Sequence, residues 1–172
     1  MARFRVRLAT RRDVDLLVRH RRGMWESMGE RDRRALDEGD RVYRRWARQR
    51  LSSKRLVGLI VEDATGQAVA SGCIWLRPTQ PGLGNTLLPN PYLLSMYTEP
   101  NYRGRGLGTR IVREAVRWCR EHGHTRLILH SSRQGRGLYR RLGFERTWEM
   151  RIKLLPSKHK SSRKRRKQVT SS

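Results

Sequence analysis

Residues 92–121 carry three patterns in direct succession: a strand-type run, a turn and an amphipathic helix. The run from Tyr92 to Thr98 predicts a strand, and Glu99-Pro100-Asn101-Tyr102 predicts a turn at its end. The next helix begins near Gly106 and stops at Gly123, and its apolar stripe consists of Ile111, Val112, Ala115, Val116 and Cys119. A helix with one apolar face buries it against another element, and a sheet that contains the preceding strand provides one. The chain is therefore expected to be an α/β protein.

The other segments alternate between the period of a strand and that of a helix. Strands are expected over residues 3–9, 55–62, 67–76, 126–130 and 145–154, the last as one strand or a pair. A first helix is capped by Thr10 and ends at Gly29, and others cover residues 30–51 and 134–142, with Gly39-Asp40 as a candidate break. Asp63-Ala64-Thr65-Gly66 predicts a hairpin, and residues 78–91 predict a surface loop. The expected order is β-α-α-β-β-β-α-β-α-β.

The charge of the chain divides it into two parts. With 40 Lys and Arg against 15 Asp and Glu, the 172 residues carry a net charge of +25. One domain is expected over residues 1–155, followed by a basic tail, residues 156–172, whose seven bases and lack of acids predict disorder. Because clustered bases release counterions from phosphates, nucleic acid is a candidate partner, above all through the tail.

The cysteines and the N-terminus favour a cytoplasmic protein. Cys73 and Cys119 belong to no Cys or His cluster, so neither a disulfide framework nor a metal site is expected. The N-terminal residues lack the apolar core of a signal peptide, and the longest apolar block, Leu56 to Val61, is too short to span a bilayer. No membrane partner is expected.

A glycine-rich turn, Arg103-Gly104-Arg105-Gly106-Leu107-Gly108-Thr109, lies between the 92–98 strand and the following helix. Glycines let a backbone approach a ligand closely, and the unpaired N–H groups of a first helical turn bind anions. A pyrophosphate would suit this position, although a tight structural turn explains the glycines equally well. The turn lacks the GK[ST] of a P-loop and the acidic residue that completes a dinucleotide fingerprint.

Together with a second motif, this turn resembles the GNAT superfamily of acetyl-CoA-dependent N-acetyltransferases. The family signature R/Q-x-x-G-x-G/A follows the fourth strand, and Arg103, Gly106 and Gly108 fit its spacing within MYTEPNYRGRGLG, Met96 to Gly108. Further along, LYRRLGFE, Leu138 to Glu145, is similar to the usual LYxxLGF. The resemblance implies a mixed, mostly antiparallel central sheet of six or seven strands flanked by four helices.

The resemblance also implies residues that bind acetyl-CoA, the acetyl donor, without a metal. Met96, Tyr97 and Thr98 would pair with pantetheine through main-chain hydrogen bonds, and backbone amides from Gly104 to Thr109 would hold the pyrophosphate. Ser132 stands where the family often has an asparagine, so that contact is shortened or lost. The expected cofactor-binding residues are Met96, Tyr97, Thr98, Arg103, Gly104, Arg105, Gly106, Leu107, Gly108, Thr109 and Ser132.

Tyr139 matches the family's general acid, which protonates the departing thiolate of CoA. From the residues alone, a packing role for this tyrosine is the alternative. The general base is not assigned, because family members place it differently. The candidates, each with a structural or solvated alternative, are Glu99, His130, Glu26 and Glu30.

The expected function is transfer of an acetyl group from acetyl-CoA to a primary amine, by direct attack in a ternary complex. The acceptor is a small molecule or a peptide or protein amine, and the basic surface disfavours a polyamine. The alternative is a catalytically weak CoA-binding protein that acts mainly as a nucleic-acid or ribosome-associated binding protein. Both are compatible with a monomer or a homodimer.

Overall fold

A computed structural model of the chain describes residues 4–80, 83, 89–150 and 152. The expected tail, residues 156–172, lies outside the described residues, as do parts of the expected 78–91 loop. The elements are β1 Arg5–Leu8, η1 Arg11–Asp13, α1 Val14–Ser27, α2 Arg33–Ser52, β2 Leu56–Glu62, β3 Ala68–Arg77, β4 Asn90–Thr98, η2 Pro100–Tyr102, α3 Leu107–Glu121, β5 Ile128–Leu129 and α4 Arg136–Arg141.

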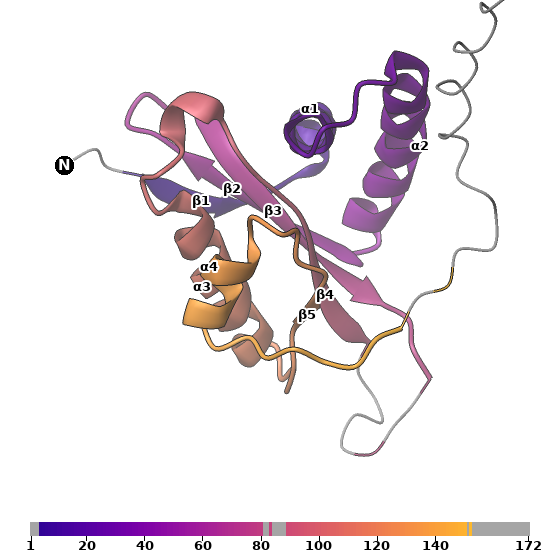
Figure 1. The fold of residues 1–172 in the computed structure, drawn as a ribbon, viewed down its shortest axis with the longest axis vertical. Coiled ribbons are helices and arrows are strands. Elements are labelled where there is room, and N and C mark those ends of the chain that lie inside the picture. Colours follow the sequence, from indigo (N-terminus) through magenta and orange to yellow (C-terminus); the bar gives the residue numbers. More distant parts are fainter. Residues whose placement is uncertain (1–3, 81–82, 84–88, 151, 153–172) are drawn as a thin grey trace, which may run out of the picture.

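Among these residues one mixed sheet of five strands runs in the order β1-β2-β3-β4-β5 (Figure 1). The first four strands pair antiparallel with their neighbours, and β5 alone pairs parallel, with β4. The β2–β3 connection is the expected hairpin, in which Gly66 has a φ of 85° and Asp63 accepts from the Thr65 amide at 2.9 Å. The α/β class and the mixed, mostly antiparallel sheet with four α-helices agree with expectation.

The sheet separates two apolar clusters. On β2, Leu59 and Val61 pack into the cluster that includes α3, whereas Ile60 packs into the cluster that includes α1 and α2. Successive side chains of β2 therefore point to opposite faces of the sheet, and both faces are covered by helices. Figure 1 shows the resulting layers, with α1 and α2 on one side of the sheet and α3 and α4 on the other.

Local signals fix the ends of the first two helices. The Thr10 hydroxyl accepts from the Arg12 amide, and Asp13 accepts from the Thr10 amide at 2.7 Å, so a capping box starts the first helical segment as expected. The break considered at Gly39-Asp40 is absent, because α2 continues through both residues. Arg22 of α1 bonds Asp37 at 2.8 Å and Asp40 at 2.7 Å, which clamps this part of α2 against its neighbour.

The expected final strand, residues 145–154, does not form in its described part. Residues 145–150 and 152 have no strand conformation, and Trp148, Met150 and Ile152 are largely exposed. The physical reason is the short neighbour: β5 contains only two residues and offers almost no ladder for another strand. The expectation of six or seven strands is thus not met by the five strands that the described residues contain.

Candidate active site

The turn between β4 and α3 has a backbone conformation that depends on its glycines. Gly104 and Gly106 have φ values of 75° and 76°, a conformation that residues with a Cβ avoid. No side chain caps the start of α3, and the Arg110 amide is the first to bond back, to the Gly106 carbonyl at 3.0 Å. The amides of the first turn are therefore available to an anion, which the helix dipole also favours.

Two arginines flank these amides. Arg103 donates through Nε to the Thr98 carbonyl at 3.1 Å, which ties the turn to the end of β4. The guanidinium of Arg105 lies 5.0 Å from the centre of the Tyr102 ring, and both arginines are exposed. Tyr102 in turn donates to Asp63 at 2.7 Å, and hydrogen bonds from Thr65 and Tyr102 lower the pKa of Asp63 to about 2. The β2–β3 hairpin is thus joined by a hydrogen bond to the segment that precedes the glycine turn.

Beside this turn, β4 has an open edge. Its pairing with β5 is limited to Tyr92 and Leu93, whereas its pairing with β3 continues to Thr98. Ser95 has a φ of 54°, and the register with β3 shifts at this point, so a bulge bends the strand where β5 leaves it. The main chain from residue 94 to 98 is therefore without a strand partner on the β5 side, among the described residues.

Met96, one of the residues expected to pair with pantetheine on this edge, packs its side chain into the protein. Its Sδ would lie 2.5 Å from a Cβ placed on Gly72, so the two residues fit only because position 72 is a glycine. Met96 also packs against the cluster that includes α3. Its main chain alone is left for a ligand, which is the kind of contact that the family resemblance implies.

Tyr139 lies on α4, and this helix is packed against the first turn of α3. A Cβ on Gly108 would lie 3.3 Å from the Leu138 side chain, so α4 approaches α3 closely at its first turn. The Tyr139 ring meets Phe144 edge to face with centroids 5.7 Å apart, and burial raises the pKa of its hydroxyl. Because its pKa is raised, the hydroxyl is protonated near pH 7. It forms no hydrogen bond with the described residues, so its proton is available to a ligand.

Ser132, the remaining expected cofactor residue, has a structural contact. Its hydroxyl accepts from the Gly135 amide at 3.1 Å, next to the start of α4, and the residue is exposed. A hydroxyl that accepts one bond can still donate another. Its expected contact with the cofactor stays a prediction.

On the opposite face of β4, α1 contributes a buried histidine that sequence reasoning missed. His20 is fully buried, with Nδ1 2.9 Å from the Ser71 hydroxyl and Nε2 3.5 Å from Glu99 Oε1. Burial lowers the pKa of His20 to about 4, so the ring is neutral near pH 7. Tyr97 donates to the other oxygen of Glu99 at 3.3 Å and covers Gly23, where a Cβ would lie 2.6 Å from its ring.

The four candidate bases differ in their surroundings. Glu99 ends β4 with its side chain 30% exposed, and so has one side on the His20 cluster and one side accessible to solvent. His130 is held by Tyr92 and by Glu149, the latter at 2.8 Å. Glu26 pairs with Arg22, and Glu30 accepts from the backbone amides of residues 31 and 32. Glu99 is therefore the carboxylate that the structure combines with a buried neutral histidine.

Solved acetyltransferases share this architecture. A GCN5-related N-acetyltransferase from Ralstonia eutropha JMP134 has 27% identity and a TM-score of 0.80, covering 88% of this chain and 99% of that chain. A predicted acetyltransferase from Clostridium acetobutylicum, solved with acetyl-CoA, has 28% identity and a TM-score of 0.79, covering 91% and 100%. Glucosamine-6-phosphate N-acetyltransferase from Arabidopsis thaliana, at 19% identity and a TM-score of 0.62 over 90% and 99% of the two chains, shares the fold alone. None of the curated proteins compared with the sequence matches it.

The mixed sheet, the glycine turn with free amides after β4 and the open β4 edge are typical of an α/β fold of the acetyltransferase type. The family model of the Acetyltransferase (GNAT) family matches residues 21–144, and the chain belongs to this family. The resemblance seen in two sequence motifs is thereby confirmed. No α-helix within the described ranges is long and apolar enough to cross a membrane.

Proposed function

We propose that the protein transfers an acetyl group from acetyl-CoA to a primary amine, by direct attack in a ternary complex. The observation that carries this proposal is the arrangement around β4: the anion-binding turn and Tyr139 lie with α3 and α4, whereas Glu99 and His20 lie toward α1. The relative from Clostridium acetobutylicum, solved with acetyl-CoA, supports the choice of donor.

On the donor side, the chain supplies binding and a proton. Amides from Gly104 to Thr109 hold the pyrophosphate, Arg103 and Arg105 add positive charge, and the β4 main chain from Met96 to Thr98 pairs with pantetheine. Tyr139 gives its proton to the sulfur as the carbon–sulfur bond breaks. Its raised pKa suits an acid that has to stay protonated until that step.

On the acceptor side, Glu99 is the proposed base. An alkylammonium has a pKa near 10, so it has to lose a proton before its nitrogen can attack the thioester carbonyl. Glu99 accepts this proton through its exposed side, directly or through one water. Neutral His20 is a positioning residue, because its ring packs between Ser71 and Glu99 and limits where the carboxylate can lie.

The decisive experiment is Tyr139→Phe in a thiol-release assay with acetyl-CoA and a panel of amines. Loss of a general acid is expected to lower kcat by about 100-fold or more, with calorimetric binding of acetyl-CoA unchanged. Tyr43→Phe is the matched control, because it removes a tyrosine hydroxyl from α2 that contacts Cys73. An unchanged kcat in Tyr139→Phe would remove this residue from the mechanism, and absence of acetyl-CoA binding to the wild type at micromolar concentration would overturn the proposal.

A further inference from the structure

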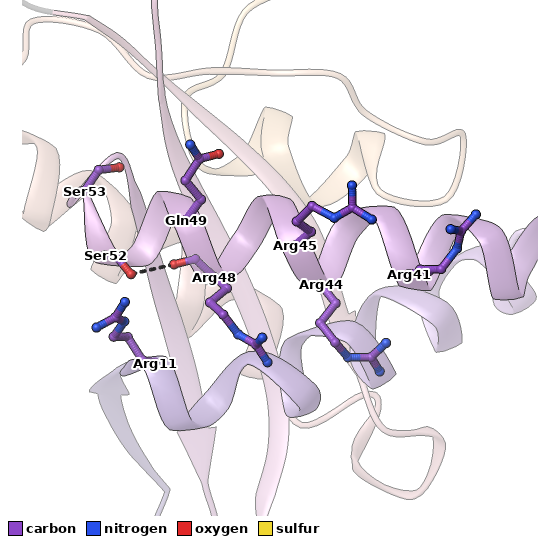
Figure 2. A pocket seen from close by; sticks show the side chains of 8 residues that line it. All are labelled: Arg11, Arg41, Arg44, Arg45, Arg48, Gln49, Ser52 and Ser53. Carbon is purple, nitrogen blue, oxygen red and sulfur yellow. Dashed lines mark hydrogen bonds between the residues drawn. The ribbon is translucent and has the colours of Figure 1, made fainter.

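A basic groove lies where α2 ends beside the start of α1. Its walls carry five arginines, Arg11 from η1 and Arg41, Arg44, Arg45 and Arg48 from α2, together with Gln49 and two serines, around an open hollow of about 760 Å³. Figure 2 shows Arg44 and Arg48 extending from α2 toward the segment that carries Arg11, while Arg41 and Arg45 extend from the other side of α2 in this view. We call this feature the arginine groove. No acidic residue lines it.

Most of the charge in the arginine groove is unbalanced. Arg44 bonds Asp15 at 2.8 Å, and Arg41 bonds Glu38. The guanidiniums of Arg11, Arg45 and Arg48 form no ion pair or hydrogen bond with any described residue, although the charge of Arg48 acts on Asp15 and helps to lower its pKa. Arg22 of α1, in contrast, contacts three carboxylates.

The fold tolerates this concentration of charge for a local reason. The groove lies along the C-terminal half of α2, where the helix dipole is negative and stabilises cations. Three exposed guanidiniums therefore line one hollow without an ion pair among the described residues, and their hydrogen-bond donors are available. Such an arrangement is suited to several anionic groups at once, because guanidinium binds phosphate oxygens through two donors.

The shape of the groove narrows the class of ligand. From Arg41 to Arg48 the helix rises about 10 Å, which is longer than a single phosphate and matches a row of them. The hollow is open and concave, so it cannot enter the major groove of duplex DNA as a protruding helix does, and a single extended strand is the ligand that suits it better. Its lining contains no aromatic side chain on which bases could stack, so the contacts are with the backbone and independent of base sequence.

We propose that the arginine groove binds the phosphodiester backbone of a single-stranded nucleic acid. The site is distinct from the anion-binding turn at the start of α3, which lies on the other side of the sheet. It does not depend on the proposed acetyl transfer, because only charge and shape enter the argument.

The test compares binding of a fluorescein-labelled single-stranded RNA, about 20 nucleotides long to exceed a typical site of about 4 to 16, by fluorescence anisotropy over a range of salt. The groove variant is Arg11→Gln/Arg45→Gln/Arg48→Gln. Loss of three phosphate contacts is expected to weaken binding about 10- to 100-fold at low salt and to reduce the slope of log K against log salt by about 2. The same measurement with a single-stranded DNA of the same sequence distinguishes two kinds of contact. Contacts with phosphate are common to RNA and DNA, whereas contacts with the 2′-hydroxyl are possible with RNA alone.

A charge-matched control distinguishes the groove from general attraction. Arg33→Gln/Arg34→Gln/Arg120→Gln removes the same charge from exposed arginines that have no ion pair among the described residues. All three proteins keep residues 156–172 and its seven bases, so any contribution of that segment is constant. Equal weakening in both variants, or wild-type affinity and slope in the groove variant with an unchanged thermal melt, would overturn the proposal. A wild-type protein that binds a duplex RNA of the same length as tightly as the single strand would also overturn the proposal.

Discussion

His20 shows how one residue can link stability to pH. In the unfolded chain its imidazole takes up a proton near pH 6.5, whereas burial lowers the pKa in the folded protein to about 4. Between these values the unfolded state binds more protons, so the contribution is complete above pH 6.5 and is lost as the pH falls toward 4. Desolvation is the largest cause of the lowered pKa, and the positive charge of Arg19 lowers it further.

We expect the free energy of unfolding to fall by about 3 kcal/mol between pH 6.5 and pH 4, at about 1.36 kcal/mol per pH unit. His20→Gln, which keeps a polar group near Ser71 but cannot be protonated, should flatten this dependence in urea titrations. Exposed His122→Gln is the control; it removes a charge that helps to lower the pKa of His124, so it should change the profile much less than His20→Gln does. Asp13, whose pKa the Arg7 guanidinium lowers to about 2, loses its contribution only below this window. A profile that His20→Gln leaves unchanged would contradict the assignment.

At the scale of the element, the start of α3 depends on the conformation of its glycines. Gly106→Ala introduces a Cβ at a φ of 76°, where space is open but the backbone is strained by about 1 kcal/mol. The strain is relieved by turning the first amides away from the anion, so the Kd for acetyl-CoA should rise about 10-fold or more while the thermal melt changes little. Gly39→Ala inside α2, where φ is helical, is the control and should leave the calorimetric Kd unchanged. Equal Kd values in wild type and Gly106→Ala would refute this role.

The element is also the scale at which sequence reasoning succeeds or fails. Local signals were sufficient where a residue acts on its own neighbours, as Thr10 does at the first cap and Gly66 does in the hairpin. The alternating pattern after residue 145 also predicted a strand, but a strand needs a partner, and the short β5 is a property of the whole sheet. His20 escaped notice because its surroundings come from distant parts of the chain: its partner Ser71 is 51 positions away.

For the whole molecule, the net charge of +25 creates a field that an anionic ligand meets before it reaches any specific contact. At an ionic strength of about 0.01 M the Debye length is about 30 Å, and at about 0.15 M it is about 8 Å. Raising the ionic strength from the lower to the higher value therefore screens most of the long-range attraction. Close contacts at the turn before α3 are screened much less. The two contributions can be separated by kinetics.

We expect the association rate of acetyl-CoA, measured by stopped-flow fluorescence, to fall about 10-fold between these ionic strengths, because steering acts on the encounter. The turnover rate at saturating acetyl-CoA, which no longer includes the encounter, should change little. Arg103→Gln/Arg105→Gln is expected to act mainly on dissociation, because it removes local contacts and only two of the charges, and to retain most of the salt dependence of association. An association rate that is insensitive to salt would mean that the basic surface does not guide acetyl-CoA. The field would then serve other polyanions, such as the single strands proposed for the arginine groove.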